Sequence, residues 1–144
     1  GEFLTSGKEG GVAFKFSAKE VLGLHKIKIN RSVEFKEEIK AIHYPWQIFQ
    51  MNDWALREDF VLITAGRKTK AISKTNKLIN PSQIFVEAGA KVEHCILNAS
   101  EGPIYIGKNA LVMEGSVIRG SVGICEGAVV KVGTRIYGAT TVGL

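Results

Sequence analysis

IYIGKNALVMEGSVIRGSVGICEGAVVKVGTRIYGATTV, residues 104–142, is the stretch of sequence that decides the fold. An aliphatic residue returns at every sixth position, and a second apolar or small residue stands two places before it. A separation of two puts both members of a pair on one face of a short strand. Because short strands at hexapeptide spacing are typical of a parallel β-helix, the pattern predicts a solenoid. The pairs are Ile104/Ile106, Ala110/Val112, Ser116/Ile118, Val122/Ile124, Ala128/Val130, Thr134/Ile136 and Thr140/Val142.

The same pairing extends back to residue 84, and it predicts how the coils stack. Three strands per coil should bury the inward residues in columns, because one coil cannot cover its own inward face. The spacing breaks once, between Asn98 and Ile106, where eight residues replace six. We therefore predict a bulging corner at 99–103 and an inward Asn98 that needs a backbone partner. The earlier pairs are Ile84/Val86, Ala90/Val92 and Ile96/Asn98, and the predicted columns are Val92, Val112, Val130 and Asn98, Ile118, Ile136.

Two blocks of this stretch, IGKNAL at 106–111 and VKVGTR at 130–135, resemble the repeat of the hexapeptide acyltransferases. That resemblance implies a left-handed parallel β-helix over residues 84–144. The handedness rests on the resemblance alone, because spacing does not determine it. The expected fold class is mainly β, with the β-helix preceded by a small α+β connector region.

Length and composition limit what the chain is. Its 144 residues, of which 45% are hydrophobic, suffice for one large domain or a small domain with an appendage. No apolar run approaches the roughly 18 residues of a membrane span, and the N-terminus has no signal-peptide pattern. We therefore expect a cytoplasmic protein. The two cysteines, Cys95 and Cys125, do not suggest a disulfide framework, and Cys125 should face outward because it follows an inward isoleucine.

The net charge of +5 arises between residues 61 and 85, which hold five basic residues and no acidic one. One interpretation is a contact with phosphate or another polyanion. The interpretation we favour is a solvated connector whose lysines protect an edge strand at the end of the solenoid. Nucleic acid is disfavoured as a partner, because aromatic residues are not interleaved with the cations and no binding motif is present. The basic residues are Arg67, Lys68, Lys70, Lys74 and Lys77.

Residues 1–65 follow other patterns. Alternation predicts a strand at 11–16, and the capping box Ser17–Glu20 predicts a short helix to about Leu24. Apolar spacing predicts a second helix at 32–42. Pro45 should begin a third helix, packed over the first coil of the solenoid. Residues 60–65 are predicted to form a strand, and residues 66–83 a basic linker together with the first strands.

Four features together resemble one family: PWQIFQMN at 45–52, Asp59-Phe60, Ala65-Gly66-Arg67, and the repeats that follow. The family is a bacterial branch of the bifunctional N-acetylglucosamine-1-phosphate uridyltransferase/glucosamine-1-phosphate acetyltransferases, and the resemblance covers about residues 40–144. Its members join a nucleotidyltransferase domain, through a helical connector, to a left-handed β-helix. The resemblance implies that residues 1–65 are the tail of that domain and the connector. It also implies a homotrimer, a sugar phosphate or nucleotide sugar as ligand, and acetyl-CoA and Mg²⁺ for the whole enzyme.

Much of that family's chemistry is missing from this sequence. Gly7-Lys8-Glu9-Gly10-Gly11 lacks the preceding strand and the spacing of a triphosphate-binding loop. Acetyl transfer needs a general base, and none of the three histidines matches the family's catalytic segment. We predict neither a catalytic residue nor a metal site, and we expect an inactive fragment of a longer enzyme. The histidines are His25, His43 and His94, of which His94 is predicted at a surface corner.

Lys131, Arg135 and Tyr137 are the candidate ligand-binding residues. Lys131 follows an inward valine and should point outward, and Arg135 belongs to the next corner. The resemblance implies that such residues bind phosphate, whereas solvated surface or trimer contact is the competing interpretation. Three functions stay open: part of a sugar-1-phosphate nucleotidyltransferase/acetyltransferase, which we favour, a separate hexapeptide acyltransferase, or a non-catalytic solenoid for oligomer assembly.

Overall fold

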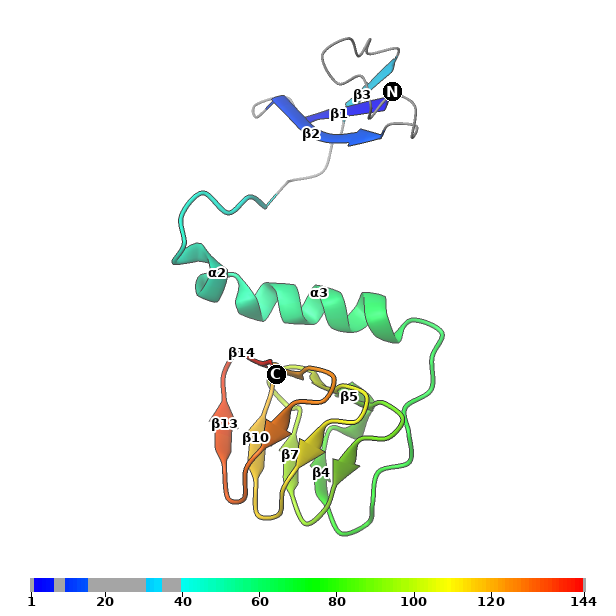
Figure 1. The fold of residues 1–144 in the computed structure, drawn as a ribbon, viewed down its shortest axis with the longest axis vertical. Coiled ribbons are helices and arrows are strands. Elements are labelled where there is room, and N and C mark those ends of the chain that lie inside the picture. The colour runs from blue at the N-terminus through cyan, green and yellow to red at the C-terminus, as the bar shows by residue number, and fades with distance from the viewer. Residues whose placement is uncertain (1, 7–9, 16–30, 35–39, 144) are drawn as a thin grey trace. The chain divides into compact units, whose positions relative to one another are not determined.

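The computed structural model describes residues 2–6, 10–15, 31–34 and 40–143. The chain divides into two compact units, Gly1–Ile42 and His43–Leu144 (Figure 1). In the first unit, β1 (Glu2–Ser6) pairs antiparallel with β2 (Gly10–Lys15) and parallel with β3 (Arg31–Glu34). β2 confirms the strand predicted at 11–16. β1 ends at Ser6, directly before the glycine-rich residues 7–11, so the prediction that no strand precedes them is wrong. The helix predicted from Ser17 to Leu24 lies outside the described residues.

The helix predicted at 32–42 is wrong wherever the structure describes that range. Residues 31–34 form β3, in which Val33 lies opposite Leu4 of β1. Residues 40–42 are not helical. Apolar spacing suggested a helix, but pairing with β1 gives the backbone of β3 its hydrogen bonds, and such long-range pairing overrides a local preference.

The second unit contains a parallel β-solenoid, as the repeat predicted. Its strands stack in three sheets, ordered β13-β10-β7-β4, β14-β11-β8-β5 and β12-β9-β6. The solenoid begins at β4, seven residues before Ile84 and within residues 66–83, the range predicted to hold the linker and the first strands. Its left-handedness stays a prediction. The bounds are β4 Lys77–Ile79, β5 Ile84–Val86, β6 Lys91–Val92, β7 Ile96–Asn98, β8 Ile104–Ile106, β9 Leu111–Val112, β10 Val117–Arg119, β11 Val122–Ile124, β12 Val129–Val130, β13 Arg135–Tyr137 and β14 Thr140–Val142.

The inward columns form a continuous apolar core. Val92, Val112 and Val130 stack in register as predicted. The second column contains Ile118 and Ile136, but its third member is Leu97 and not Asn98. Leu97 is fully buried, while its neighbours in β7 lie on the outward face. The prediction of an inward Asn98 is therefore wrong.

Corner lengths explain this correction. The corner between β6 and β7 has three residues, 93–95, whereas the equivalent corners before β10 and β13 have four. The missing residue shifts β7 by one position, and a shift of one exchanges the two faces of a strand. The next corner, 99–103, is long, as predicted. Asn98 is satisfied there, because its Oδ1 accepts hydrogen bonds from the Ser100 backbone N (3.0 Å) and Oγ (2.6 Å).

The first coil would expose an edge of unpaired backbone groups, and side chains from residues 69–76 cover it. Thr69 Oγ1 accepts a hydrogen bond from Val86 N (2.8 Å). Asn76 makes two hydrogen bonds to the first coil: its Oδ1 accepts from Cys95 N (2.9 Å) and its Nδ2 donates to Val92 O (2.7 Å). These groups take the place that a preceding coil would occupy, and so protect the edge from pairing with another chain.

Replacing Asn76 with alanine should therefore destabilise this end of the solenoid. Two part-buried backbone groups would lose their partners, which we expect to lower the free energy of unfolding by about 1–2 kcal/mol. Denaturant unfolding followed by circular dichroism measures the change. Ser82→Ala is the control, because Ser82 Oγ bonds only the side chain of Asn80 at an exposed site. Equal stability of the two variants would contradict the capping role of Asn76.

A helix runs along one sheet of the solenoid (Figure 1). α2 (Gln47–Gln50) follows Pro45, and α3 (Asn52–Thr64) follows Met51, so the helix predicted from Pro45 is confirmed, although it is divided in two. Two details were wrong. Residues 60–64 continue α3 and do not form a strand. The helix also reaches beyond the first coil, since Asn52 Nδ2 donates to Ala139 O of the last corner (3.0 Å).

Candidate functional site

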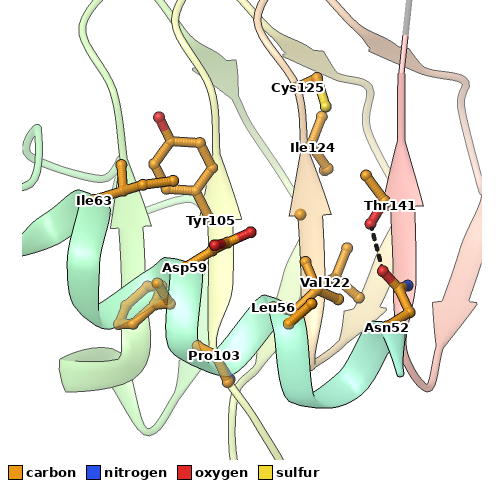
Figure 2. A pocket seen from close by; sticks show the side chains of 13 residues that line it. Asn52, Leu56, Asp59, Ile63, Pro103, Tyr105, Val122, Ile124, Cys125 and Thr141 are labelled. Carbon is orange, nitrogen blue, oxygen red and sulfur yellow. Dashed lines mark hydrogen bonds between the residues drawn. The ribbon is translucent and has the colours of Figure 1, made fainter. Parts of the chain in front are cut away.

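A small apolar cavity of about 190 Å³ lies between α3 and the β5-β8-β11-β14 sheet (Figure 2). The lining from α3 comes from one helical face, at spacings of three and four residues. The sheet contributes the surface around Tyr105 and Gly123. Side chains that line the cavity include Leu56, Phe60, Ile63, Pro103, Val122 and Ile124, with Asn52, Asp59, Cys125 and Thr141 as polar or reactive members.

Glycine at position 123 permits α3 to lie close to the sheet. A Cβ at this position would lie 2.9 Å from Leu56 Cδ2. Polar contacts hold the first turn of the helix: Ser121 Oγ donates to Asp53 Oδ1 (2.7 Å), and Thr141 Oγ1 donates to Asn52 Oδ1 (3.1 Å). The hydrogen bonds from Arg57 and Ser121 lower the pKa of Asp53, so its carboxylate stays charged at neutral pH.

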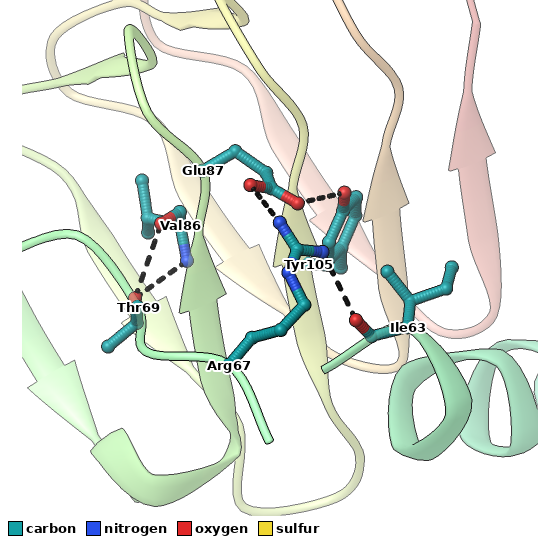
Figure 3. Close-up of polar contacts among 6 residues, drawn as sticks. All are labelled: Ile63, Arg67, Thr69, Val86, Glu87 and Tyr105. Atoms are coloured by element: carbon teal, nitrogen blue, oxygen red, sulfur yellow. Dashed lines mark hydrogen bonds and ion pairs between the residues drawn. The ribbon is translucent and has the colours of Figure 1, made fainter. Parts of the chain in front are cut away.

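The other end of α3 is held by a network of Arg67, Glu87 and Tyr105 (Figure 3). The Glu87 carboxylate accepts one hydrogen bond from Tyr105 OH (2.7 Å) and one from Arg67 Nη2 (2.7 Å). Arg67 Nη1 also donates to Ile63 O at the end of the helix (3.1 Å), and the guanidinium lies 5.3 Å from the centre of the Phe85 ring. The side chain of Glu87 is only 14% exposed, so both of its oxygens need these donors.

The network changes how its members titrate. The hydrogen bonds from Tyr105 and Arg67 lower the pKa of Glu87. Burial, and then the Glu87 carboxylate, raise the pKa of Tyr105 from its ordinary 10.0 to about 12. Each group thus favours the protonation state that keeps the network intact at neutral pH. These contacts make the network a structural joint between α3 and the solenoid.

Loss of this network should be visible at alkaline pH. Since the pKa of Tyr105 is higher in the folded protein, its contribution to stability is complete below pH 10 and is lost as the pH rises through about 12. We expect Tyr105→Phe to be less stable than the parent at pH 9, with the difference disappearing toward pH 12. Thermal unfolding across this range, with Tyr137→Phe as an exposed control, measures it. A difference that does not change with pH would contradict the assignment.

The structure brings two of the three candidate ligand residues together. Arg135 and Tyr137 line a shallow hollow of about 480 Å³ on the outer surface of β10 and β13, with Arg119 beside them. Lys131 is exposed, as predicted, but it does not line this hollow. Binding of a ligand by any of the three stays a prediction.

Members of the basic cluster fill different roles. Arg67 belongs to the network around Glu87, and Lys70 Nζ donates to Ala90 O (2.9 Å) at the end of the solenoid. Lys77 lies on β4, the outermost strand of its sheet. These positions favour the interpretation in which the cations protect an edge strand over the interpretation in which they form a single phosphate site.

Histidine and cysteine chemistry is sparse in the part of the chain that the structure describes. His94 lies at an exposed corner with φ +53°, as predicted, and its backbone N donates to Thr75 Oγ1 (3.1 Å). Within residues 40–143, no group of three His, Cys, Asp or Glu side chains is placed to hold a metal ion. Cys125 is exposed, as predicted, and Cys95 is buried; both are free thiols.

Two residues that contribute to these sites were not identified from the sequence. Tyr105 alternates with inward Ile104 and Ile106, which marked it as outward, but its bond to Glu87 depends on the geometry of two coils. The other is Arg119, which lies one coil before Tyr137, 18 positions away in sequence. That period was present in the repeat and identifies Arg119 as its neighbour.

Comparisons with known proteins give one match. Residues 1–68 match a family model described as sugar nucleotidyl transferase. Neither the search of curated proteins nor the search of solved structures gave a match. The family match supports a sugar nucleotidyltransferase-like family for this chain. Within the described ranges, the protein has no helix of the length and apolar character that crossing a membrane requires.

Proposed function

We propose that this protein takes part in nucleotide-sugar synthesis, as part of a sugar-1-phosphate nucleotidyltransferase/acetyltransferase of the UDP-N-acetylglucosamine type. The match of residues 1–68 to the sugar nucleotidyl transferase family carries the proposal. The solenoid that follows supports it, because this combination is what the sequence resemblance implies. By itself the 144-residue chain is expected to be inactive in both reactions.

The two faces of α3 support a connecting role. The helix lies within the residues that match the nucleotidyltransferase family, yet one of its faces packs on the solenoid. Its other face exposes large apolar side chains, with Val61 69% and Leu62 77% exposed. Large apolar side chains exposed together on a helix usually mark a surface that another domain or partner covers. We propose that α3 is the connector to a nucleotidyltransferase domain.

The chemistry of the implied cofactors is limited by the residues present. The acidic and histidine side chains of the described part do not converge as Mg²⁺ would need, so we derive no step through this ion. His94 lies at an exposed corner and lines neither the cavity under α3 nor the hollow on β10 and β13. We therefore derive no acetyl-transfer step from acetyl-CoA on these residues.

A metabolic experiment tests the proposed function. Deleting the gene in the organism that carries it should lower one nucleotide-sugar pool and raise the matching sugar 1-phosphate, both measured by liquid chromatography and mass spectrometry. Complementation with the intact gene should restore both pools. Unchanged pools in the deletion strain would overturn the proposal.

Oligomer assembly is the second candidate, and the exposed apolar face of α3 favours it. If the solenoid serves assembly alone, the purified chain forms a defined oligomer while the pools stay unchanged. Sedimentation velocity measures that state, and the homotrimer implied by the resemblance is the expected form. A separate acyltransferase is distinguished by release of CoA from acetyl-CoA when the purified chain is mixed with an amino sugar.

A further inference from the structure

The hollow on β10 and β13 has a geometry set by strand register. The two strands pair in parallel, with Val117 opposite Arg135 and Arg119 opposite Tyr137. Ile118 and Ile136 point into the core between them, so these four side chains lie on the outward face. Arg119 and Arg135 are therefore diagonal neighbours, a separation of about 7–8 Å between Cα atoms that two long side chains bridge.

The charges in this hollow are not balanced by the protein alone. Arg119 Nη2 pairs with Glu101 Oε1 (2.5 Å), while the guanidinium of Arg135 makes no ion pair or hydrogen bond within the described residues. Glu101 is the single acidic residue that lines the hollow, against two arginines. Tyr137 is 80% exposed, so the face of its ring is open to solvent.

Glu101 is held in place by its backbone rather than by its carboxylate. It lies in the long 99–103 corner, where its carbonyl oxygen accepts a hydrogen bond from Arg57 Nη2 (2.5 Å). Its side chain is 61% exposed, and that of Arg119 is 48% exposed. An exposed ion pair contributes little to stability, so an anion of higher charge can displace the carboxylate without disturbing the corner.

We propose that this hollow binds the diphosphate of a nucleoside diphosphate group, with Arg119 and Arg135 on the phosphates and Tyr137 against the base. Guanidinium groups match phosphate oxygens in bidentate geometry, and an exposed aromatic ring offers a stacking surface to any base. Glu101 acts as an internal counter-ion that the ligand replaces on Arg119. The choice of a nucleoside diphosphate, the group that nucleotide sugars carry, rests on the proposed function.

Two other cations in the described residues already have partners. Arg67 is bonded to the largely buried Glu87, and Lys70 to a backbone carbonyl. The cavity under α3 has an apolar lining and would not solvate a diphosphate. The hollow thus combines an unpaired arginine, a displaceable ion pair and an open aromatic ring.

Isothermal titration of the full chain with UDP tests the proposal. We expect Arg135→Ala and Arg119→Ala each to weaken binding about tenfold or more, and Tyr137→Leu to weaken it several-fold. Glu101→Gln should tighten binding several-fold, because it removes the competing carboxylate. Lys77→Ala is the matched control: it removes a cation from the same sheet and row as Arg135, three strands away, and should leave the affinity unchanged.

The outcomes separate this inference from the proposed function. Absence of UDP binding, or equal affinity of the parent, Arg135→Ala and Lys77→Ala proteins, overturns the hollow as a site even when the metabolic pools respond to gene deletion. Weaker binding by Glu101→Gln overturns the counter-ion role. Binding that depends on both arginines supports the site, and if the pools are unchanged, it is the proposed function alone that fails.

Discussion

Replacing Ile118 with aspartate is expected to abolish the folded solenoid. Ile118 is fully buried in β10, between Leu97 and Ile136 of the neighbouring coils. A carboxylate there has no partner among the apolar side chains of the core, and burying it would cost more than about 4 kcal/mol even if it takes up a proton. Since domains of this size are stable by only about 5–15 kcal/mol, we expect the cooperative unfolding transition to be lost or shifted far downward. Circular dichroism during thermal unfolding measures it.

A neighbouring pair of valines provides the control for this experiment. Val129 and Val130 are adjacent in β12, but Val130 is 3% exposed and Val129 is 44% exposed. Val130→Asp should behave like Ile118→Asp, whereas Val129→Asp should change the unfolding midpoint little. If both valine variants unfold alike, or if Ile118→Asp keeps the parent's midpoint, the inward register of these strands is wrong.

The columns of the solenoid could be predicted because the same pattern of inward and outward residues returns every six residues. Every inward pair is supported by the same pair one coil away, so Val112 and Ile118 were placed from spacing alone. The prediction failed at β7, where one residue is missing from the preceding corner. The spacing of residues in the sequence does not distinguish a shorter corner from a polar residue in the core. For that reason Asn98 was predicted at the inward position that Leu97 occupies.

The candidate site was less accessible from sequence, because it depends on contacts between elements. Phe60 and Ile63 belong to an apolar run that suits a strand or a helix, and packing against the sheet decides for the helix. The hydrogen bond between Tyr105 and Glu87 joins two coils. It depends on the path of the chain at a corner, which the spacing of residues in the sequence does not predict. Arg135 and Tyr137 were recognised as outward, and the three-hexad period of the repeat would have placed Arg119 beside Tyr137, as the strand register now shows.

Gly107→Ala is the second variant with a large expected effect. Gly107 follows β8, and its backbone N donates to Ile124 O of the next coil (2.7 Å). A Cβ at this position would lie 2.6 Å from Glu126 N and 2.7 Å from Cys125 C, both backbone atoms that cannot rotate away. The two coils must separate locally, which weakens this hydrogen bond and loosens the core. We expect a loss of about 1–3 kcal/mol in the free energy of unfolding.

The last coil provides the matched control, because Gly143 follows β14 as Gly107 follows β8. A Cβ at Gly143 would meet nothing within 4 Å. Gly143→Ala should therefore be neutral or slightly stabilising, since alanine restricts the unfolded chain more than glycine does. Denaturant unfolding of both variants decides the matter. If both variants lose the same free energy of unfolding, the loss arises from the backbone preference of glycine and not from the close approach of Gly107 to Cys125 and Glu126. A loss of stability in Gly107→Ala but not in Gly143→Ala would show that the coils are closely stacked at Gly107, as its hydrogen bond to Ile124 requires.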